Sequence, residues 1–490
     1  MNRKQLALAT IVFTARCQSA PRTSDAPSMD AVARESATPR DRAEIEDEGA
    51  VDATTVDASD ASVSETSPSD SAGDSTIEDA GPRSFEDEVD RYLSSESDPA
   101  APTLLDRLET DFRDRSFAQT LDAVRHAPPG RAARMDGVRS WRWSNPFTGV
   151  DGAWFSYVPP ALARTPDEPA PLVLFLHWAG GSGDAVVTDP SFQATAESLG
   201  AILAAPTSEA VCDWSGSERC MSQVLSSLRA IKRQWRVDDS RVVLSGFSMG
   251  GRGSFSTGAA YPEPWSAVVP VAGSIGALFN TTDVARHQSY CCPHAENLRD
   301  SRTHHTIGGA DLAIAVAFNQ GCAACFTSLG LDARYSEPPG VGHTIEPAPW
   351  RASVAWGLAR ARESYPRRVT YNLRVHTSSI TPGGVYFHQS LRDSLYWVAI
   401  ESRRDASMPA RIDAVTDGAQ ITITTSNVAR LTVYLSDEIV PMDQPVRIAV
   451  NATIAHNALV PRDRRFLLTE ARRRADRTMT FAAAVAIDVP

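Results

Sequence analysis

The hydrophobic pattern divides the chain into stretches with different periodicities. In residues 85–127, apolar residues such as Leu104 and Leu108 recur at helical spacing, which predicts one or two amphipathic helices. Between residues 141 and 364, short apolar runs alternate with helical stretches. Beyond Tyr365, apolar and polar residues alternate with a period of two, and helical patterning nearly vanishes. The pattern therefore predicts a helical extension, a mixed α/β domain and a β domain, in that order.

The middle stretch predicts a parallel sheet covered by helices. Leu172–Leu176 is almost uniformly apolar, as a parallel strand buried on both faces must be. A helix at Ser222–Trp235 has its apolar residues on one side and leads into a strand at Val242–Leu244. Such a repeated series of strands and helices is typical of an α/β fold with a doubly wound sheet. The other predicted strands are Trp154–Val158, Ile202–Ala205, Ala267–Val271, His304–Ile307 and Ala333–Ser336, and the other predicted helices end at Ala260 and cover Asn319–Gly330.

The last stretch predicts a separate β domain. Its segments of period two are separated by turns such as Asp417-Gly418, which is the pattern of strands with one buried face. Antiparallel strands of this kind commonly pack as a sandwich. We expect an all-β, sandwich-like accessory domain at residues 366–490. Its predicted strands are Thr370–His376, Leu395–Glu401, Ile421–Thr425, Leu431–Leu435 and Val446–Val450.

The negative charge is concentrated near the N-terminus. The chain has a net charge of −12, and residues 21–80 alone contain 16 Asp and Glu against 4 Arg. Residues 21–82 contain no aromatic residue and cannot bury enough apolar surface to offset chain entropy, so we expect a disordered acidic linker there. The remainder is neutral overall and has no strongly basic stretch. A nucleic-acid partner is therefore not expected.

The first residues resemble an export signal. Arg3 and Lys4 precede the apolar stretch Leu6–Ala15, which is too short to span a bilayer. Cys17 lies where a bacterial lipoprotein signal has its lipidated cysteine, but Arg16 replaces the small residue usual before it. A lipid anchor at Cys17 and ordinary secretion both remain open, and no later segment is apolar enough to span a membrane. The expected divisions are an export signal at 1–20, the linker at 21–82, a helical extension at 83–140, the α/β domain at 141–365 and the accessory domain at 366–490.

The segment Gly246-Phe247-Ser248-Met249-Gly250 carries the main chemical signal. It directly follows the apolar run Arg241–Ser245, so the pattern predicts a strand that enters a sharp turn with Ser248 at its apex. Glycines on both sides permit a turn that is too tight for a Cβ atom. The alternative is a glycine-rich surface turn, which the motif alone does not exclude.

A serine nucleophile needs a histidine base and an acid that orients it. In chains with a turn of this type, the acid and then the histidine follow later in the sequence, each at the end of a later strand. Asp311 and His343 are in this order, each just after a predicted strand. The alternatives are that Asp311 only caps the next helix and that His343 is an ordinary loop histidine. If Asp311 were not the acid, Asp283 or Asp332 would be the next candidate.

Backbone amides are expected to stabilise the negative charge that forms on a carbonyl oxygen under attack. The Met249 amide, just after the serine, is one candidate. The second is expected in the loop after the Leu172–Leu176 strand, which reads His-Trp-Ala-Gly-Gly. We predict Trp178 first and Ala179 second as the contributor from this loop.

These motifs together resemble a known family. Residues 237–273, which include VDDSRVVLSGFSMGG and YPEPWSAVVPVAG, are similar to the secreted feruloyl-esterase and polyhydroxybutyrate-depolymerase-like branch of the α/β-hydrolases, related to prolyl oligopeptidase. The family's oxyanion loop, acid turn and histidine turn correspond to His177–Gly181, Gly308–Asp311 and Gly340–His343. Trp178 departs from the glycine usual in that loop. The resemblance covers about residues 171–364 and implies the α/β-hydrolase fold.

The residues and the resemblance together predict an exported serine hydrolase of the cell envelope or exterior. It would cleave carboxylic esters, small or borne on a polymer, through an acyl-enzyme that uses Ser248, His343 and Asp311, with no cofactor and no metal. One alternative is a serine peptidase of the prolyl-oligopeptidase type. Another is an exported binding protein whose catalytic domain is inactive. If the accessory domain serves attachment or polymer binding, removal of residues 366–490 is expected to leave hydrolysis of a small soluble ester intact.

The remaining six cysteines indicate an oxidising compartment. Cys212 and Cys220 are expected to form a local bridge. Two further bridges between the pair Cys291-Cys292 and the pair Cys322 and Cys325 are favoured over a zinc site built from the same four thiolates.

Overall fold

The structure is a computed structural model that describes residues 83–95, 100–126, 134–145, 148–209, 212, 214, 218–274, 282–373 and 394–490. All of them belong to the second of two compact units of the chain, Ile77–Pro490. The predicted export signal, with Cys17, and the whole of the predicted linker lie outside the described residues. Among the described helices, none is both long enough and apolar enough for a membrane span.

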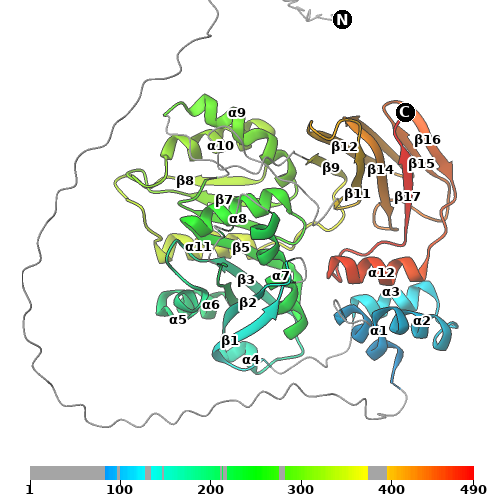
Figure 1. Cartoon of the computed structure of the whole chain (residues 1–490), viewed down its shortest axis with the longest axis horizontal. Coiled ribbons are helices and arrows are strands. Elements are labelled where there is room, and N and C mark those ends of the chain that lie inside the picture. The colour runs from blue at the N-terminus through cyan, green and yellow to red at the C-terminus, as the bar shows by residue number, and fades with distance from the viewer. Residues whose placement is uncertain are drawn as a thin grey trace, which may run out of the picture. The chain divides into compact units, whose positions relative to one another are not determined.

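The α/β region is built on an eight-stranded sheet with the order β1-β2-β4-β3-β5-β6-β7-β8 (Figure 1). The β1–β2 and β2–β4 pairs are antiparallel, and every later pair is parallel. This strand order is that of the α/β-hydrolase fold, which confirms the predicted fold class. The strands are β1 (Gly137–Ser144), β2 (Asp151–Val158), β3 (Ala170–Leu176), β4 (Ile202–Pro206), β5 (Val237–Phe247), β6 (Ala267–Val271), β7 (Arg302–Thr306) and β8 (Ala333–Ser336).

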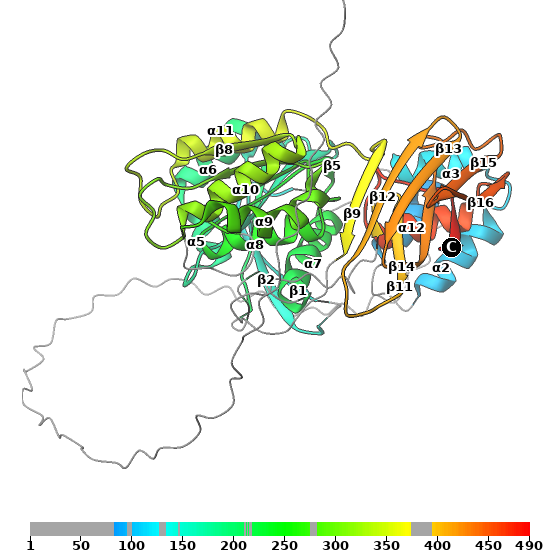
Figure 2. The same ribbon diagram turned by 90° about the horizontal axis from the view of Figure 1, so that it is seen from above.

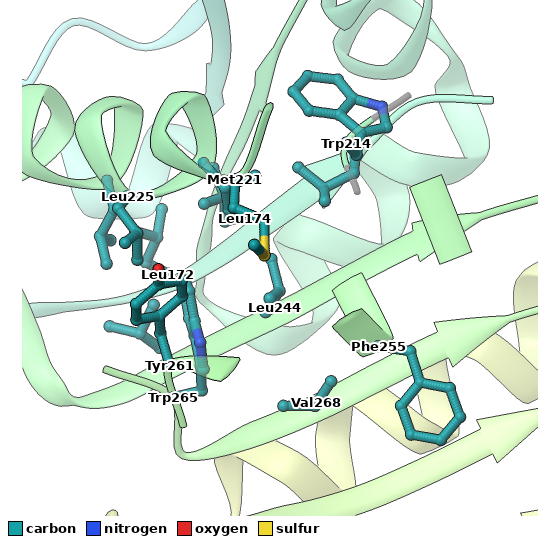
Figure 3. Packing of buried hydrophobic residues seen from close by; sticks show 14 of the residues in the cluster. Leu172, Leu174, Trp214, Met221, Leu225, Leu244, Phe255, Tyr261, Trp265 and Val268 are labelled. Carbon is teal, nitrogen blue, oxygen red and sulfur yellow. The ribbon is translucent and has the colours of Figure 1, made fainter. Parts of the chain in front are cut away.

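Helices cover both faces of this sheet, because its central strands are apolar on both sides. Leu172 and Leu174 of β3 join one buried cluster, whereas Val173 and Phe175 join another. Part of the first cluster is drawn in Figure 3. It includes residues of α7 (Glu218–Gln234), α8 (Met249–Ala260), α9 (Val284–Ala295) and α10 (Val316–Leu329). The second cluster includes residues of α5 (Gly183–Thr188), α6 (Pro190–Leu199) and α11 (Pro347–Leu358), and two short elements complete the region, α4 (Pro160–Ala163) and η1 (Glu296–Leu298).

The edge strand β1 was missed by the sequence analysis, and the boundary expected at residue 141 falls inside it. Arginines and serines alternate along β1 with Trp141 and Trp143. The Trp141 ring stacks on Trp154 of β2, with 5.1 Å between the ring centroids. Two tryptophans alone do not make a pattern of period two long enough to predict a strand, so β1 could not be recognised from the sequence.

The C-terminal region consists of two sheets that share one buried core (Figure 2). The sandwich-like arrangement agrees with the expectation, except that β13 and β15 pair in parallel rather than antiparallel. One sheet has the order β10-β11-β14-β17 and the other β16-β15-β13-β12-β9. The strands are β9 (Arg368–Leu373), β10 (Ser394–Leu395), β11 (Val398–Arg403), β12 (Ala410–Asp417), β13 (Gln420–Ser426), β14 (Val428–Leu435), β15 (Val446–Val450), β16 (Thr453–Ala458) and β17 (Ala483–Asp488).

The C-terminal region also contains a helix that the sequence analysis did not predict. Helix α12 (Arg464–Arg474) is capped by Asp463, whose side chain accepts the backbone N–H groups of Arg465 and Phe466. Its buried Leu467, Leu468 and Ala471 pack in one cluster with the N-terminal helices (Figure 1). Five arginines in eleven residues masked this short apolar side. The N-terminal helices are α1 (Phe85–Ser94), α2 (Ala101–Asp111) and α3 (Phe117–Arg125).

Buried ion pairs join the C-terminal region to the α/β region. Arg474, at the end of α12, has a fully buried side chain and binds Glu470 at 2.6 Å and Glu263 of the α/β region at 3.1 Å. Arg362 binds Asp476 at 2.7 Å, also fully out of solvent. Buried charges are stable only when they are paired. The fit between the two regions therefore depends on both partners of each pair.

Candidate active site

The turn at Ser248 has the sharp geometry that the sequence predicted. Strand β5 ends at Phe247 and α8 begins at Met249, and Ser248 between them has a φ of 57° and a ψ of −114°. A Cβ atom on Gly250 would lie 1.8 Å from the carbonyl oxygen of Leu176, and one on Gly246 would lie 2.3 Å from that of Gly250. Both glycines are therefore required by close backbone contacts, which hold Ser248 in an unfavourable conformation.

Ser248, His343 and Asp311 lie in one hydrogen-bonded series. The distance from His343 Nε2 to Ser248 Oγ is 2.8 Å, and that from His343 Nδ1 to Asp311 Oδ2 is also 2.8 Å. An ionised carboxylate only accepts hydrogen bonds, so Nδ1 carries the proton and Nε2 accepts the Ser248 hydroxyl. The Asp311 side chain is fully buried and that of His343 is 25% exposed. The three residues selected from the sequence are thus brought together.

Asp311 has a second set of partners in its own loop. Its Oδ1 accepts the backbone N–H groups of Ala313 at 2.8 Å and Ile314 at 2.9 Å. The carboxylate therefore holds the following turn with one oxygen and His343 with the other. It does not cap the next helix, because α10 begins at Val316 and its N-cap residue is Ala315. The other acids considered are engaged elsewhere: Asp283 caps α9, and Asp332 pairs with Arg302 and Arg360.

The loops that carry Asp311 and His343 are tied to each other through their backbones. The Gly309 N–H donates to Pro338 O at 2.9 Å, and the Ala310 N–H donates to Val341 O at 2.8 Å. These bonds fix the separation of the acid and the histidine independently of their side chains. The relative position of Asp311 and His343 is therefore set by the ends of β7 and β8 and by the backbone bonds between the two loops. This agrees with the expectation that each residue follows a strand of the sheet.

The predicted oxyanion amides lie on two backbone segments in close contact. Met249 is the first residue of α8, so its N–H has no partner within the helix. The Gly250 contact with Leu176 O places this first turn of α8 against the end of β3, directly before Trp178 and Ala179. Both candidate segments thus border Ser248, which is the arrangement an oxyanion hole needs.

A cavity of about 320 Å³ opens beside His343. The Phe247 ring lies with its centroid 4.9 Å from that of His343, and Trp178 meets Phe247 edge-on at 6.2 Å. Trp350 of α11 lines the cavity and donates its indole N–H to Ser245 Oγ at 3.0 Å. The sequence analysis missed Phe247 and Trp350 as site residues, because a wall formed by three distant segments has no local signature. The lining residues are Trp178, Asp189, Ser191, Phe192, Phe247, His343, Thr344, Ile345, Pro347 and Trp350.

The six cysteines form three disulfide bridges. They join Cys212 to Cys220, Cys291 to Cys322 and Cys292 to Cys325. The local bridge and the two cross-bridges were expected, and the structure adds the pairing between α9 and α10. The bridges occupy all four sulfur atoms that a zinc site would have used.

No protein-family model matches the chain, and no curated protein matches it. Solved structures to which it is similar include a thermostable esterase, at 21% identity and a TM-score of 0.35, with 45% of this chain and 59% of the other covered. The chain thus spans about three fifths of that esterase. An S-formylglutathione hydrolase from Agrobacterium tumefaciens is 16% identical, with coverages of 48% and 99% and a TM-score of 0.37. A ferulic acid esterase from the anaerobic fungus Anaeromyces mucronatus is 13% identical, with coverages of 48% and 94% and a TM-score of 0.37.

Proposed function

We propose that this protein is a serine hydrolase that cleaves carboxylic esters through an acyl-enzyme. The observation that carries the proposal is the series of two hydrogen bonds, each 2.8 Å long, that joins Ser248 through His343 to the buried Asp311. This series lies at the strained turn between β5 and α8, where the serine faces loops from the ends of β3, β7 and β8. Such an arrangement activates a hydroxyl that is otherwise a weak nucleophile.

The proposed reaction begins with attack of Ser248 Oγ on the ester carbonyl carbon, while His343 Nε2 takes the hydroxyl proton. Asp311 holds His343 in the tautomer with the proton on Nδ1 and stabilises the imidazolium that forms. Negative charge on the carbonyl oxygen is stabilised by the amide of Met249 and by that of Trp178 or Ala179. The alcohol leaves with the proton from His343, and water activated by the same nitrogen then releases the acid.

The cavity beside His343 supports an ester with an apolar group next to the reacting bond. Its walls include Trp178, Phe247 and Trp350, which provide large flat apolar surfaces. The cleavage of esters, peptides and polymers is distinguished by assaying the purified protein with aryl esters of increasing acyl size, acetylated and feruloylated sugars, polyhydroxybutyrate and a peptide panel. Turnover of esters with no cleavage of peptides is the expected result, and the reverse result would favour the peptidase alternative.

Asp311→Asn is expected to lower kcat by about 10⁴-fold while the protein stays folded. An asparagine oxygen still accepts the N–H groups of Ala313 and Ile314, so the turn is preserved. Its amide NH₂ group then faces His343 Nδ1 and can only donate, which forces the proton of the ring onto Nε2 and leaves no base for Ser248. Steady-state kinetics with a soluble aryl ester measure the effect, with Asp332→Asn as the control at an acid of a neighbouring loop. Equal activity of both variants would remove Asp311 from the mechanism.

We also propose that the protein works outside the reducing cytoplasm. Three disulfide bridges support this location, since such bridges persist in oxidising compartments. The export signal at residues 1–20, and a lipid at Cys17 as one form of attachment, are part of this proposal. Mass measurement of the protein purified from its native envelope distinguishes the two forms, because only the lipoprotein begins at a diacylated Cys17.

A further inference from the structure

We propose that Trp214 is a positioning residue for the oxyanion hole, acting through the carbonyl group of His177 and anchored by the Cys212–Cys220 bridge. This inference rests on the proposed function of Ser248. It concerns the loop after β3, from which the second oxyanion amide is expected. It also explains why a fully buried tryptophan lies between two bridged cysteines.

The Trp214 indole N–H donates to the backbone oxygen of His177, with 3.0 Å between the two atoms. That oxygen and the N–H of Trp178 belong to the same planar peptide group, in which they point in opposite directions. A bond that fixes the direction of the His177 carbonyl therefore also fixes the direction of the Trp178 amide. Trp214 thus controls the orientation of a predicted oxyanion donor without touching substrate.

The next peptide group of the loop is held in the same manner. The carbonyl oxygen of Trp178 bonds to His177 Nδ1 at 2.8 Å and accepts the Gly181 N–H at 3.0 Å. His177 Nε2 accepts the Ser208 N–H at 3.1 Å, so the proton of the neutral ring is on Nδ1 and is donated to Trp178 O. Burial lowers the pKa of His177 more than its bond to Trp178 raises it, so the pKa lies below the ordinary histidine value and the neutral ring is favoured. The orientation of the Ala179 amide is fixed by this network.

Trp214 itself is held on three sides. Its side chain has no exposed surface, its ring meets the His177 ring edge-on at 5.1 Å, and its backbone has a φ of 64°. A Cβ atom on Gly253 would lie 2.1 Å from Trp214 Cβ, so α8 packs directly on this residue. The bridge from Cys212 to Cys220 joins the Trp214 segment to α7. The same indole therefore contacts both the oxyanion loop and the helix that begins at the nucleophile.

The matched comparison is between Trp214→Phe and Trp265→Phe. Both substitutions remove a buried indole N–H from the α/β region. Trp265 lies in the turn before β6, and in Figure 3 the side chains of Leu172 and Leu174 separate it from Trp214. The structure gives Trp265 Nε1 no hydrogen-bond partner among the described residues. Loss of packing is similar in the two variants, and loss of control over a backbone amide occurs in only one.

Trp214→Phe is expected to lower kcat by about 10- to 100-fold, because small errors in oxyanion geometry weaken transition-state stabilisation. KM should stay within about twofold, since the ground-state ester does not depend on this donor. The affinity for an aryl boronic acid, which forms a tetrahedral adduct on serine, should fall by the same factor as kcat/KM. Trp265→Phe should lower the unfolding temperature without changing either kinetic constant.

Equal kcat values for the two folded variants, or a loss in Trp214→Phe confined to KM, would overturn the inference. If Trp214→Phe does not fold, the double variant Cys212→Ala, Cys220→Ala keeps the indole but frees its segment. We then expect the same loss of kcat and boronate affinity, reduced in size, and wild-type values would overturn the inference. Ser248→Ala is assayed alongside: its retained activity would refute the proposed function, whereas its inactivity with unaffected Trp214→Phe would refute only the role of Trp214.

Discussion

Ser248→Ala is expected to lower ester hydrolysis by about 10⁶-fold and to leave only the residual catalysis that the oxyanion hole and substrate binding provide. The variant retains the amides of the oxyanion hole and the cavity, but it has no atom that can form the acyl-enzyme. Serine and alanine both have a Cβ atom, so the strain of the φ of 57° at this position is about the same in the variant and the fold should persist. The measurement is the initial rate with a soluble aryl ester at saturating concentration.

The matched control for this variant is Ser289→Ala. Ser289 lies exposed on α9 and donates its hydroxyl only to the carbonyl of Arg286 in its own helix. Wild-type rates for Ser289→Ala together with loss of activity in Ser248→Ala would isolate the nucleophile. A folded Ser248→Ala protein with undiminished rates would contradict the mechanism, and an inactive wild type with an intact fold would favour the binding-protein alternative.

The second large effect is expected from Arg474→Ala, which should lower the free energy of unfolding by about 3–5 kcal/mol. The substitution leaves Glu263 and Glu470 buried without this cation, although the side chains of both are at most 7% exposed. Glu263 also accepts the backbone N–H of Tyr396, so the loss extends to the start of the C-terminal core. Urea unfolding followed by fluorescence and by far-ultraviolet circular dichroism measures the change.

Arg430→Ala is the control for the loss of an arginine. Arg430 pairs with Asp488 at 3.0 Å, but their side chains are 50% and 81% exposed, and such a pair contributes less than about 1 kcal/mol. Equal unfolding midpoints for Arg474→Ala and Arg430→Ala would show that the buried pairs do not hold the two regions together.

The same ion pairs give a pH dependence of stability. Burial alone would raise the pKa of Glu470, but Arg474 and Arg473 lower it to about 2. Because the pKa is lower in the folded protein than in the unfolded chain, this stabilisation is complete above the ordinary glutamate pKa and is lost as the pH falls towards 2. The difference in unfolding free energy between the wild type and Glu470→Gln should shrink over that interval.

The expectation that residues 366–490 form a removable module does not fit these contacts. Removing them would take away Arg474 and Asp476, the partners of Glu263 and Arg362, and would expose to water a surface that the whole chain buries. The truncated protein is therefore expected to misfold rather than to retain activity on a small ester. The two regions should instead unfold in a single transition.

The parts of the fold that the sequence predicted are those with local causes. β3 is visible as an uninterrupted apolar run, and Gly246 and Gly250 are visible because the turn at Ser248 excludes any Cβ atom. The order of Asp311 and His343 follows from the connectivity of a parallel sheet, which a linear pattern preserves.

The missed parts depend on contacts between residues far apart in the chain. Arg474 and Glu263 are 211 positions apart, and neither has a local pattern that indicates its partner. Trp214 carries no motif, and its relation to the oxyanion loop depends on one hydrogen bond to a backbone oxygen. Helix α12 was hidden because five of its eleven residues are arginines. The grouping of Ser248, His343 and Asp311 could thus be predicted, whereas the distant contacts around it could not.

The most direct test of the proposed chemistry is covalent labelling of the purified protein with a fluorophosphonate, followed by peptide mapping. Phosphonylation requires a serine activated by a nearby base, so the reagent reports the contact between Ser248 and His343. We expect one equivalent of label, located at Ser248, and no label in Ser248→Ala. Label at another residue, or an unlabelled wild-type protein that still hydrolyses esters, would contradict the assignment of Ser248 as the nucleophile.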